Sequence, residues 1–420
     1  MSRFVLTTFG SLGDLHPTIA IGLGLARRGH EAIVATSEAY RRPIESLGLG
    51  FRPLRPDWPA AEDEAAFVER FLEMRRGPKR LICEFMMPLV RQSFEDTLRA
   101  AAGADFLLAH PLTFGTRLVA EKTGIRWASS HLFPMSFFSV FDPPLVSVAP
   151  NLSRMRFLGP RFFRLALLWG KRHVRPWSEP WHRLRREIGL PPTADPLFDG
   201  AHSPRLILAL FSPLLGRPQP DWPRQTVVTG FPLYDRSAAG MPAELSRFLD
   251  NGSPPVVFTL GSAAVLDAGR FFVDSVAAAR ALGRRAVLLT GRVEQHLPAS
   301  LSSGVIACSY APFSELFPRA AAVVHHGGIG TTTQALRAGR PMLVMPYSYD
   351  QPDNAARVTR LGVARVVSRR RYTAGRAAAE LDRLLADPAY AARAAAIGAR
   401  IRAEDGVAVA CDALEAAAGA

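Results

Sequence analysis

The chain has 420 residues, of which 48% are hydrophobic and 21% are charged. This composition is typical of a globular protein, excludes disorder over most of the length, and allows two or three domains. The formal net charge is +14, yet only three of the 51 basic residues are lysines. We interpret the excess of arginine as a generally basic, solvated surface, and we expect no nucleic-acid partner. Two basic clusters, Arg183–Arg186 and Ser368–Tyr372, are candidates for contacting lipid head groups.

The cysteines and the lengths of the apolar segments indicate the cellular compartment of the protein. Cys83, Cys308 and Cys411 are far apart and odd in number, which argues against a disulfide framework or a zinc site and fits a reducing cytoplasm. The N-terminus shows no signal-peptide pattern, and no apolar stretch is long enough to span a bilayer. We expect a cytoplasmic protein, and any membrane contact would be peripheral, at the inner membrane face.

The N-terminal residues alternate between strand and helix patterns. Residues 3–8 predict a buried strand, 10–14 a glycine-rich turn, 18–28 a helix closed by Gly29, and 30–36 the next strand. The pattern continues through 106–109, 119–123 and 125–129. Strands joined by helices in this way predict a parallel sheet.

A second alternating series begins near residue 256. Strands are predicted over 256–260, 286–290, 322–325 and 342–345, and helices over 271–282, 331–337 and 354–361. The stretch 212–255 between the two series is rich in proline and resembles an interdomain linker, whereas 390–420 is rich in alanine and helical.

The two series predict an α/β protein with two doubly wound, Rossmann-like domains facing across a cleft. We place an N-terminal domain at 1–215, a linker region at 216–255, a C-terminal domain at 256–395, and a final helix at 396–420 that packs back on the N-terminal domain. In such folds ligands bind at the carboxyl ends of the strands, so the cleft is the expected active site.

The region 130–192 is rich in Phe, Trp, Pro and Arg. Two interpretations fit this composition equally well. The region forms either core helices with exposed arginines or an apolar pocket whose entrance is basic. Under the second interpretation, Phe133, Phe137 and Phe138 would contact an acceptor molecule. His110 and His131 each follow a predicted strand and either serve the structure or face the cleft, where His110 would also contact the acceptor.

A glycine run, HHGGIGT, separates the strand at 322–325 from the following helix. Glycines let the backbone approach a ligand, and the helix N-terminus offers unpaired N–H groups, so the segment can cradle a diphosphate. His326 and Thr331 can add hydrogen bonds to phosphate oxygens. A histidine at this place can also be a capping or core residue.

The residues that follow give this segment a specific resemblance. His326 and Gln351, 25 positions apart, resemble in register the first and last residues of the donor-binding signature of family 1 nucleotide-sugar glycosyltransferases, as do Pro341 and Pro346 between them. The resemblance implies that His326 contacts the donor phosphates, with its neighbour His325 as a partner. It implies further donor-binding roles for Ser262, Gly327, Gly328, Gly330 and Thr331 at the diphosphate, for Tyr310 and Ala311 at the base, and for Asp350 and Gln351 at the sugar hydroxyls. The family's ribose-binding Glu is replaced by Gln334, so the base and the ribose stay open.

The N-terminal segment Gly10–Pro17 resembles the G-S-R-G-D-V-x-P segment of bacterial and fungal glycosyltransferases that act on sterols and antibiotic aglycones. It also resembles the bacterial rhamnosyltransferases that glycosylate hydroxy fatty acids. The resemblance implies that Asp14 is the general base, with His16 assisting. Asp14 could instead be the N-cap of the following helix. A dinucleotide-binding fingerprint is rejected, because the segment lacks G-x-G-x-x-G and the second strand lacks a terminal acidic residue.

Taken across the chain, the resemblance implies a GT-B fold and an inverting hexosyltransferase. The expected donor is a UDP- or dTDP-sugar, and the expected acceptor is a hydroxyl of an apolar small molecule or lipid. No cofactor or metal is expected, because helix N-termini and histidine neutralise the departing diphosphate. Two alternatives remain open: a nucleotide-sugar epimerase of the same fold, and a non-catalytic glycosyltransferase-like partner protein.

Overall fold

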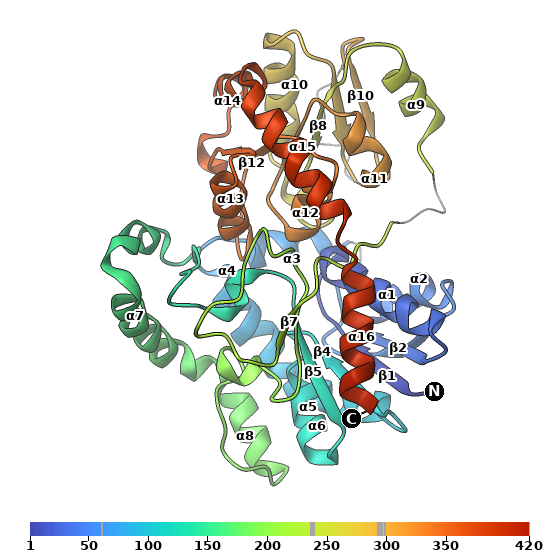
Figure 1. Ribbon diagram of the computed structural model, residues 1–420, viewed down its shortest axis with the longest axis vertical. Helices are drawn as coiled ribbons and strands as arrows, with labels where there is room; N and C mark the ends of the chain where they lie inside the picture. Colours follow the sequence, from blue (N-terminus) through green and yellow to red (C-terminus); the bar gives the residue numbers. More distant parts are fainter. Residues whose placement is uncertain (60–61, 236–239, 292–296, 298–299, 420) are drawn as a thin grey trace. The chain divides into compact units, whose positions relative to one another are not determined.

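The computed structural model describes residues 1–59, 62–235, 240–291, 297 and 300–419, and it contains two compact units (Figure 1). Unit 1 comprises residues 1–71, 75–234 and 404–420, and unit 2 comprises 72–74 and 235–403. The division after Tyr234 falls inside the predicted linker, of which residues 236–239 lie outside the described part of the chain. Strand β7 (Thr226–Val228) shows that part of this stretch belongs to the sheet of unit 1.

Unit 1 contains a seven-stranded parallel sheet with the order β3-β2-β1-β4-β5-β6-β7. Its other strands are β1 (Arg3–Thr7), β2 (Glu31–Thr36), β3 (Gly50–Pro53), β4 (Phe106–Ala109), β5 (Arg126–His131) and β6 (Ile207–Ala209). Its helices are α1 (Leu12–Arg27), α2 (Arg41–Glu45), α3 (Glu64–Phe71), α4 (Gly77–Arg80), α5 (Val90–Ala100), α6 (Phe114–Thr123), α7 (Gly159–Val174), α8 (Glu179–Glu187) and α16 (Gly406–Gly419).

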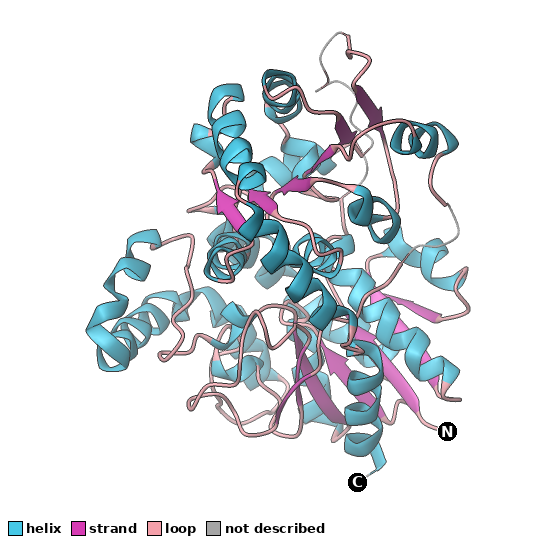
Figure 2. Cartoon of the chain, turned by 45° about the horizontal axis from the view of Figure 1, so that its top comes forward, coloured by secondary structure: helices cyan, strands magenta, loops and turns pink. Residues whose placement is uncertain are grey.

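Side chains along each strand point alternately to the two faces of this sheet. Since these strands carry apolar residues on both faces, helices cover both of them. Val5 of β1 belongs to a buried cluster with residues of α5, α6 and α8, among them Phe94, Leu118 and Trp181. Leu6, the next residue, lies against α1, which also packs against α16. The strands of each unit lie between helices (Figure 2).

Helix α1 begins six residues earlier than the sequence predicts. Ser11 is its N-cap, and Ser11 and Asp14 form a reciprocal capping box that fixes the first turn. Pro17 lies inside the helix, where sequence reasoning would place a boundary. Asp14 is therefore in the first turn and is not the N-cap. Gly29 has φ +83° just after the helix, which confirms the predicted helix end.

Unit 2 contains a six-stranded parallel sheet with the order β10-β9-β8-β11-β12-β13. The strands are β8 (Val256–Thr259), β9 (Ala286–Leu289), β10 (Val305–Cys308), β11 (Ala322–His325), β12 (Met342–Val344) and β13 (Ala364–Val366). The helices are α9 (Ala243–Asp250), α10 (Phe271–Ala281), α11 (Phe313–Leu316), α12 (Ile329–Arg337), α13 (Gln351–Arg360), α14 (Ala374–Ala386) and α15 (Pro388–Arg402).

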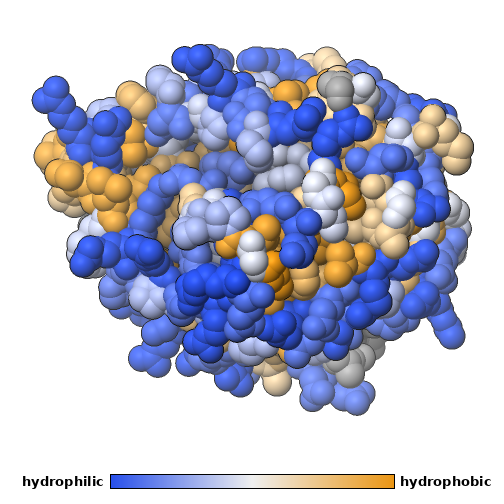
Figure 3. Space-filling model, turned by 90° about the horizontal axis from the view of Figure 1, so that it is seen from below, coloured by the Kyte–Doolittle hydropathy of each residue, from blue (hydrophilic) through white to orange (hydrophobic). Residues whose placement is uncertain are grey.

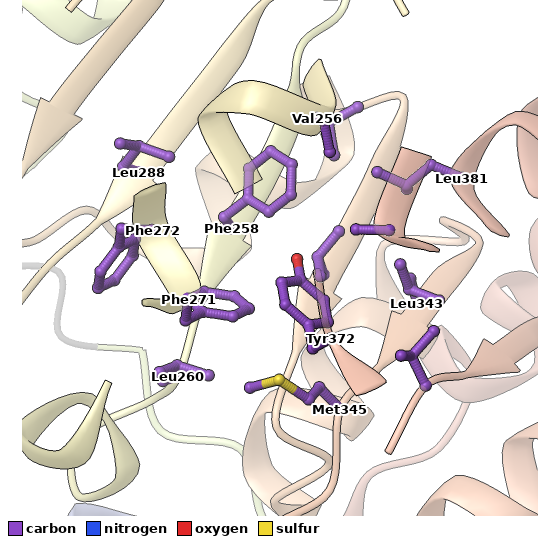
Figure 4. Close-up of a cluster of buried hydrophobic side chains, with 14 of the residues drawn as sticks. Val256, Phe258, Leu260, Phe271, Phe272, Leu288, Leu343, Met345, Tyr372 and Leu381 are labelled. Carbon is purple, nitrogen blue, oxygen red and sulfur yellow. The ribbon is translucent and has the colours of Figure 1, made fainter. Parts of the chain in front are cut away.

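Aromatic and aliphatic side chains fill the space between this sheet and helices α10 and α14 (Figure 4). Phe258 and Phe272 are fully buried, and the buried Tyr372 hydroxyl lies 2.8 Å from the Ser275 hydroxyl. The two sheets confirm the prediction of two doubly wound α/β domains.

The alanine-rich C-terminal run forms two helices in different units. Helix α15 belongs to unit 2, whereas α16 belongs to unit 1, where it packs against α1. Among the described residues, no helix is both long and apolar enough to cross a membrane.

Candidate functional site

Each sheet reverses its strand order at one place, which is where open α/β sheets bind ligands. In unit 1 the reversal lies between β1 and β4, and in unit 2 it lies between β8 and β11. Asp14 follows β1 and His110 follows β4 in unit 1. Ser262 follows β8 and His326 follows β11 in unit 2. The chain order alone therefore brings the predicted catalytic and phosphate-binding residues to these two positions.

The Asp14 carboxylate is held at one oxygen and open at the other. The Ser11 backbone N–H donates to Oδ2 over 2.9 Å, and the Ser11 hydroxyl lies 3.4 Å from the same oxygen. Oδ1 lies 3.5 Å from Nε2 of His110. Gly10 has φ +136° and packs against the carboxylate, so no other residue fits there. The side chain stays 27% exposed, so Oδ1 can reach a ligand.

His110, predicted as an acceptor-binding residue, lies beside the predicted base. Its Nδ1 accepts a 3.3 Å hydrogen bond from the Leu112 backbone N–H, which assigns the ring proton to Nε2. Nε2 lies 3.5 Å from Asp14 Oδ1. The pairing joins residues about 100 positions apart, so no local motif could have revealed it.

His16 does not share this arrangement. Residues two apart on a helix point in nearly opposite directions, so His16 and Asp14 occupy different faces of α1. The His16 ring instead makes an edge contact with Tyr234, at 5.2 Å between centroids.

The three predicted acceptor phenylalanines are not brought together around one cavity. Phe137 is buried and stacks on Trp222 at 4.0 Å, as a core residue does. Phe138 contacts Phe198, and Phe133 is half-buried. A small cavity does lie beside His110, lined mainly by apolar and aromatic residues that include Pro111, Phe114, Trp127 and Trp181. None of the three phenylalanines lines it.

In unit 2, the His326 ring lies against two glycines. A Cβ at Gly261 would come within 2.6 Å of the ring, and a Cβ at Gly328 would come closer still. Burial lowers the pKa of His326 to about 4, so the ring is neutral at pH 7. Its Nδ1 is buried and has no partner among the described residues.

His325 has a structural environment. It is fully buried, its Nδ1 accepts a 3.0 Å hydrogen bond from the Gly327 N–H, and burial lowers its pKa to about 3. Gly327 has φ +88°, and its carbonyl accepts a 3.0 Å hydrogen bond from the Asn354 amide. These contacts fix the backbone of the loop that carries His326.

The glycine run leads into α12, whose N-cap is Gly328 and carries no side-chain cap. The first-turn amides, those of Ile329, Gly330 and Thr331, therefore lack the partner that a Ser or Asp cap would give. Thr331 is buried beside them. Unpaired amides at the positive end of a helix dipole are an anion site.

Asp350 and Gln351 follow β12 and begin α13. Gln351 Oε1 accepts hydrogen bonds from the backbone N–H groups of Tyr347 and Ser348, at 2.9 and 3.3 Å. Its amide nitrogen is the donor that it can offer to a ligand. Asp350 Oδ2 accepts a 2.6 Å hydrogen bond from Asn354. Asn354, which sequence reasoning missed, thus ties this loop to the glycine run; its spacing of four from Asp350 on a helix was the available signal.

The other residues predicted to bind the donor lie in loops that follow the carboxyl ends of β8 and β10. Ser262 is exposed on the loop after β8, next to Gly261. Tyr310 follows β10 and is 37% exposed, whereas Ala311 is buried. Both of these residues belong to the short loop that joins β10 to α11.

Gln334 is paired with a residue that the sequence did not single out. Its amide nitrogen donates to Asp235 Oδ1 over 3.1 Å, and Arg337 forms a 2.9 Å ion pair with the other oxygen of Asp235. Gln334 Oε1 is buried with no partner among the described residues. Asp235 therefore holds the amide nitrogen, and the amide oxygen remains a buried acceptor without a partner among the described residues. Within the described part of the chain, no group of metal-binding side chains comes together.

Comparison with known proteins identifies the class. Residues 4–138 match the glycosyltransferase family 28 N-terminal domain, and residues 278–413 match the C-terminal domain of erythromycin biosynthesis protein CIII-like proteins. The chain is 36% identical over 429 aligned positions to the O-mycaminosyltylonolide 6-deoxyallosyltransferase of Streptomyces fradiae, covering 98% of this chain and 97% of that protein.

Two solved structures support the fold. The glycotransferase of kitacinnamycin has a TM-score of 0.73 and 22% identity, covering 99% of this chain and 100% of that one. Glycosyltransferase VinC in complex with dTDP has a TM-score of 0.69 and 22% identity, covering 99% of both chains. The fold and the two sites define a glycosyltransferase of the GT-B fold. The chain belongs to the family 1 glycosyltransferases, and it is a glycosyltransferase enzyme. The epimerase and non-catalytic alternatives are therefore wrong.

Proposed function

We propose that the protein transfers a hexose from a nucleoside-diphosphate sugar to a hydroxyl of an apolar acceptor, with inversion at the anomeric carbon. The observation that carries the proposal is the Asp14 carboxylate, held at Oδ2 by Ser11 and open at Oδ1 beside His110. A carboxylate fixed in this way is suited to a general base, because only one oxygen has to meet the substrate.

The proposed reaction is a single displacement. Asp14 Oδ1 takes the proton of the acceptor hydroxyl while that oxygen forms a bond to the anomeric carbon. The bond from this carbon to the diphosphate oxygen breaks on the opposite side, and the nucleoside diphosphate leaves with the electron pair. His326 and the first amides of α12 stabilise the charge on the leaving diphosphate. We propose that these groups suffice without a bound metal.

The donor is proposed to be a UDP- or dTDP-sugar, with a deoxyribose donor accepted at least as well as a ribose one. The support is Gln334, whose neutral Oε1 has no partner among the described residues and stands where family members have a Glu. A neutral amide bonds a ribose hydroxyl less strongly than a carboxylate does. The Streptomyces fradiae relative is named for transfer of 6-deoxyallose, which supports a hexose of this class.

The acceptor is proposed to be an apolar, hydroxyl-bearing small molecule or lipid. The support is the relative's named acceptor, O-mycaminosyltylonolide. We also propose a cytoplasmic location, since Cys83, Cys308 and Cys411 are all free thiols.

The test is Asp14→Asn, with Asp382→Asn on the exposed face of α14 as the matched control. Asp14→Asn should lower the rate of nucleoside-diphosphate release by about 10²–10⁴ while the calorimetric affinity for nucleoside diphosphate stays unchanged. Asp382→Asn should change neither value. Near-normal turnover in Asp14→Asn would overturn the assignment of the base.

A further inference from the structure

Helix α7 exposes large apolar side chains to solvent. Leu165, Leu168 and Trp169 are 69%, 57% and 71% exposed, and Phe157 in the turn before the helix is 83% exposed. Apolar side chains gather at the left edge of Figure 3, the side that α7 occupies in Figure 1. Single exposed leucines need no explanation, but a contiguous group that includes Trp indicates an interaction surface.

Arginines share this outward face. Leu165, Leu168 and Trp169 follow helical spacing, and Arg161, Arg164 and Arg172 lie on the same side of the helix. Phe163, on the opposite side, is buried against the rest of unit 1. The outward face therefore combines an apolar strip with cations at both of its ends.

The charge of the whole segment has one sign. Residues 143–178 contain seven Lys or Arg residues and no Asp or Glu. Arg161, Arg164 and Arg172 form no ion pair with any residue that the structure describes, whereas Lys171 pairs with Asp199. The surface is complementary to a partner that presents negative charge above an apolar layer.

We propose that the outward face of α7, with the turn that precedes it, docks on an anionic lipid surface. A helix in this position buries Leu and Trp at the boundary between head groups and acyl chains, and its long cations reach back to the lipid phosphates. Trp is suited to this boundary because its ring is apolar and its N–H is polar. The proposal does not depend on the identity of the sugar or the acceptor.

The experiment is flotation of the full-length protein with vesicles of phosphatidylcholine, with and without phosphatidylglycerol. Binding is expected with the anionic vesicles only, and it should weaken by about tenfold or more between low and high salt, because the head-group attraction is screened. Leu165→Ser/Leu168→Ser/Trp169→Ser should abolish it. Arg161→Gln/Arg164→Gln/Arg172→Gln should leave only salt-independent, residual binding.

The control is Leu301→Ser/Val366→Ser, which removes exposed apolar side chains elsewhere and should bind like the wild type. Thermal unfolding of each variant checks that the fold is retained, as expected for exposed positions. Absence of binding to anionic vesicles at low salt would overturn the proposal, as would binding that the α7 variants leave unchanged. A triple variant that loses self-association, with no vesicle binding by the wild type, would assign the face to a second copy and also overturn it.

Discussion

Gly328→Ala tests whether the position of the His326 ring matters for the donor. The Gly328 backbone has φ −59° and ψ 142°, which any residue adopts, so the substitution causes no backbone strain. The new Cβ would lie 2.3 Å from Nε2 of His326, whereas ordinary contact begins at 3.4 Å. The imidazole must therefore move by about 1 Å, the difference between these two distances.

A displacement of this size has a measurable cost. Misplacement by about 1 Å lowers reactivity by roughly 100-fold, which corresponds to about 2.7 kcal/mol of transition-state stabilisation. Replacing an N-cap glycine by alanine also destabilises the helix, by up to about 1 kcal/mol. We therefore expect a large loss in kcat/KM, weaker calorimetric binding of nucleoside diphosphate, and a small decrease in Tm.

A double substitution separates the clash from other effects. In His326→Ala/Gly328→Ala the ring that meets the new Cβ is absent, so the double variant should match His326→Ala and the two losses should not add. Gly375→Ala, where an added Cβ meets nothing within 4 Å, is the control and should keep full activity. Unchanged kcat/KM in Gly328→Ala, or fully additive losses in the double variant, would refute the role assigned to His326.

Two further predictions concern the nucleotide and the pH. In competition assays a dTDP-sugar should be used at least as well as the matching UDP-sugar, because Gln334 offers only a neutral oxygen; a clear preference for UDP-sugars would refute this. Burial lowers the pKa of His325 to about 3 and of His326 to about 4, from 6.5, so the unfolded chain binds more protons than the folded one as the pH falls below 6.5. The free energy of unfolding should therefore decrease between pH 7 and pH 5, by roughly 2 kcal/mol for each ring. Urea unfolding that is independent of pH over this range would show that the two rings are not shielded from water.

The sequence predicts best the elements whose apolar pattern is local. Strands β4 and β11 have the predicted bounds, and α10 differs from its prediction by one residue. The predicted helix at 18–28 is too short because Pro17 suggests a boundary, although the Ser11 and Asp14 pair is a helix-start signal in the sequence. At this position the capping pair prevails over the proline.

Short strands are harder to predict. Strands β6 and β7 have three residues each, and β7 lies in a proline-rich stretch whose composition resembles a linker. Three residues carry too little periodicity to distinguish a strand from a loop, and only pairing with β5 and with each other makes them strands. The same reasoning applies to the acceptor region, where aromatic content alone does not separate the buried Phe137 from the exposed Trp169.

Local sequence patterns reveal some residues of the candidate site, whereas others depend on contacts between distant parts of the chain. The sequence singles out His326 and Gln351 because each belongs to a loop and the helix after it in a fixed register, and their donor-binding roles stay predictions. His110 and Asp235 were not predicted in their observed roles, because each acts through a residue about 100 positions away. The predicted doubly wound fold class does imply that the strand order reverses once in each sheet, and each reversal leaves a gap beyond the strand ends that neighbouring helices do not cover. Both units place a charged or polar pair at that gap, so a chain-order argument together with the motifs would have brought His110 to Asp14 before any coordinates were known.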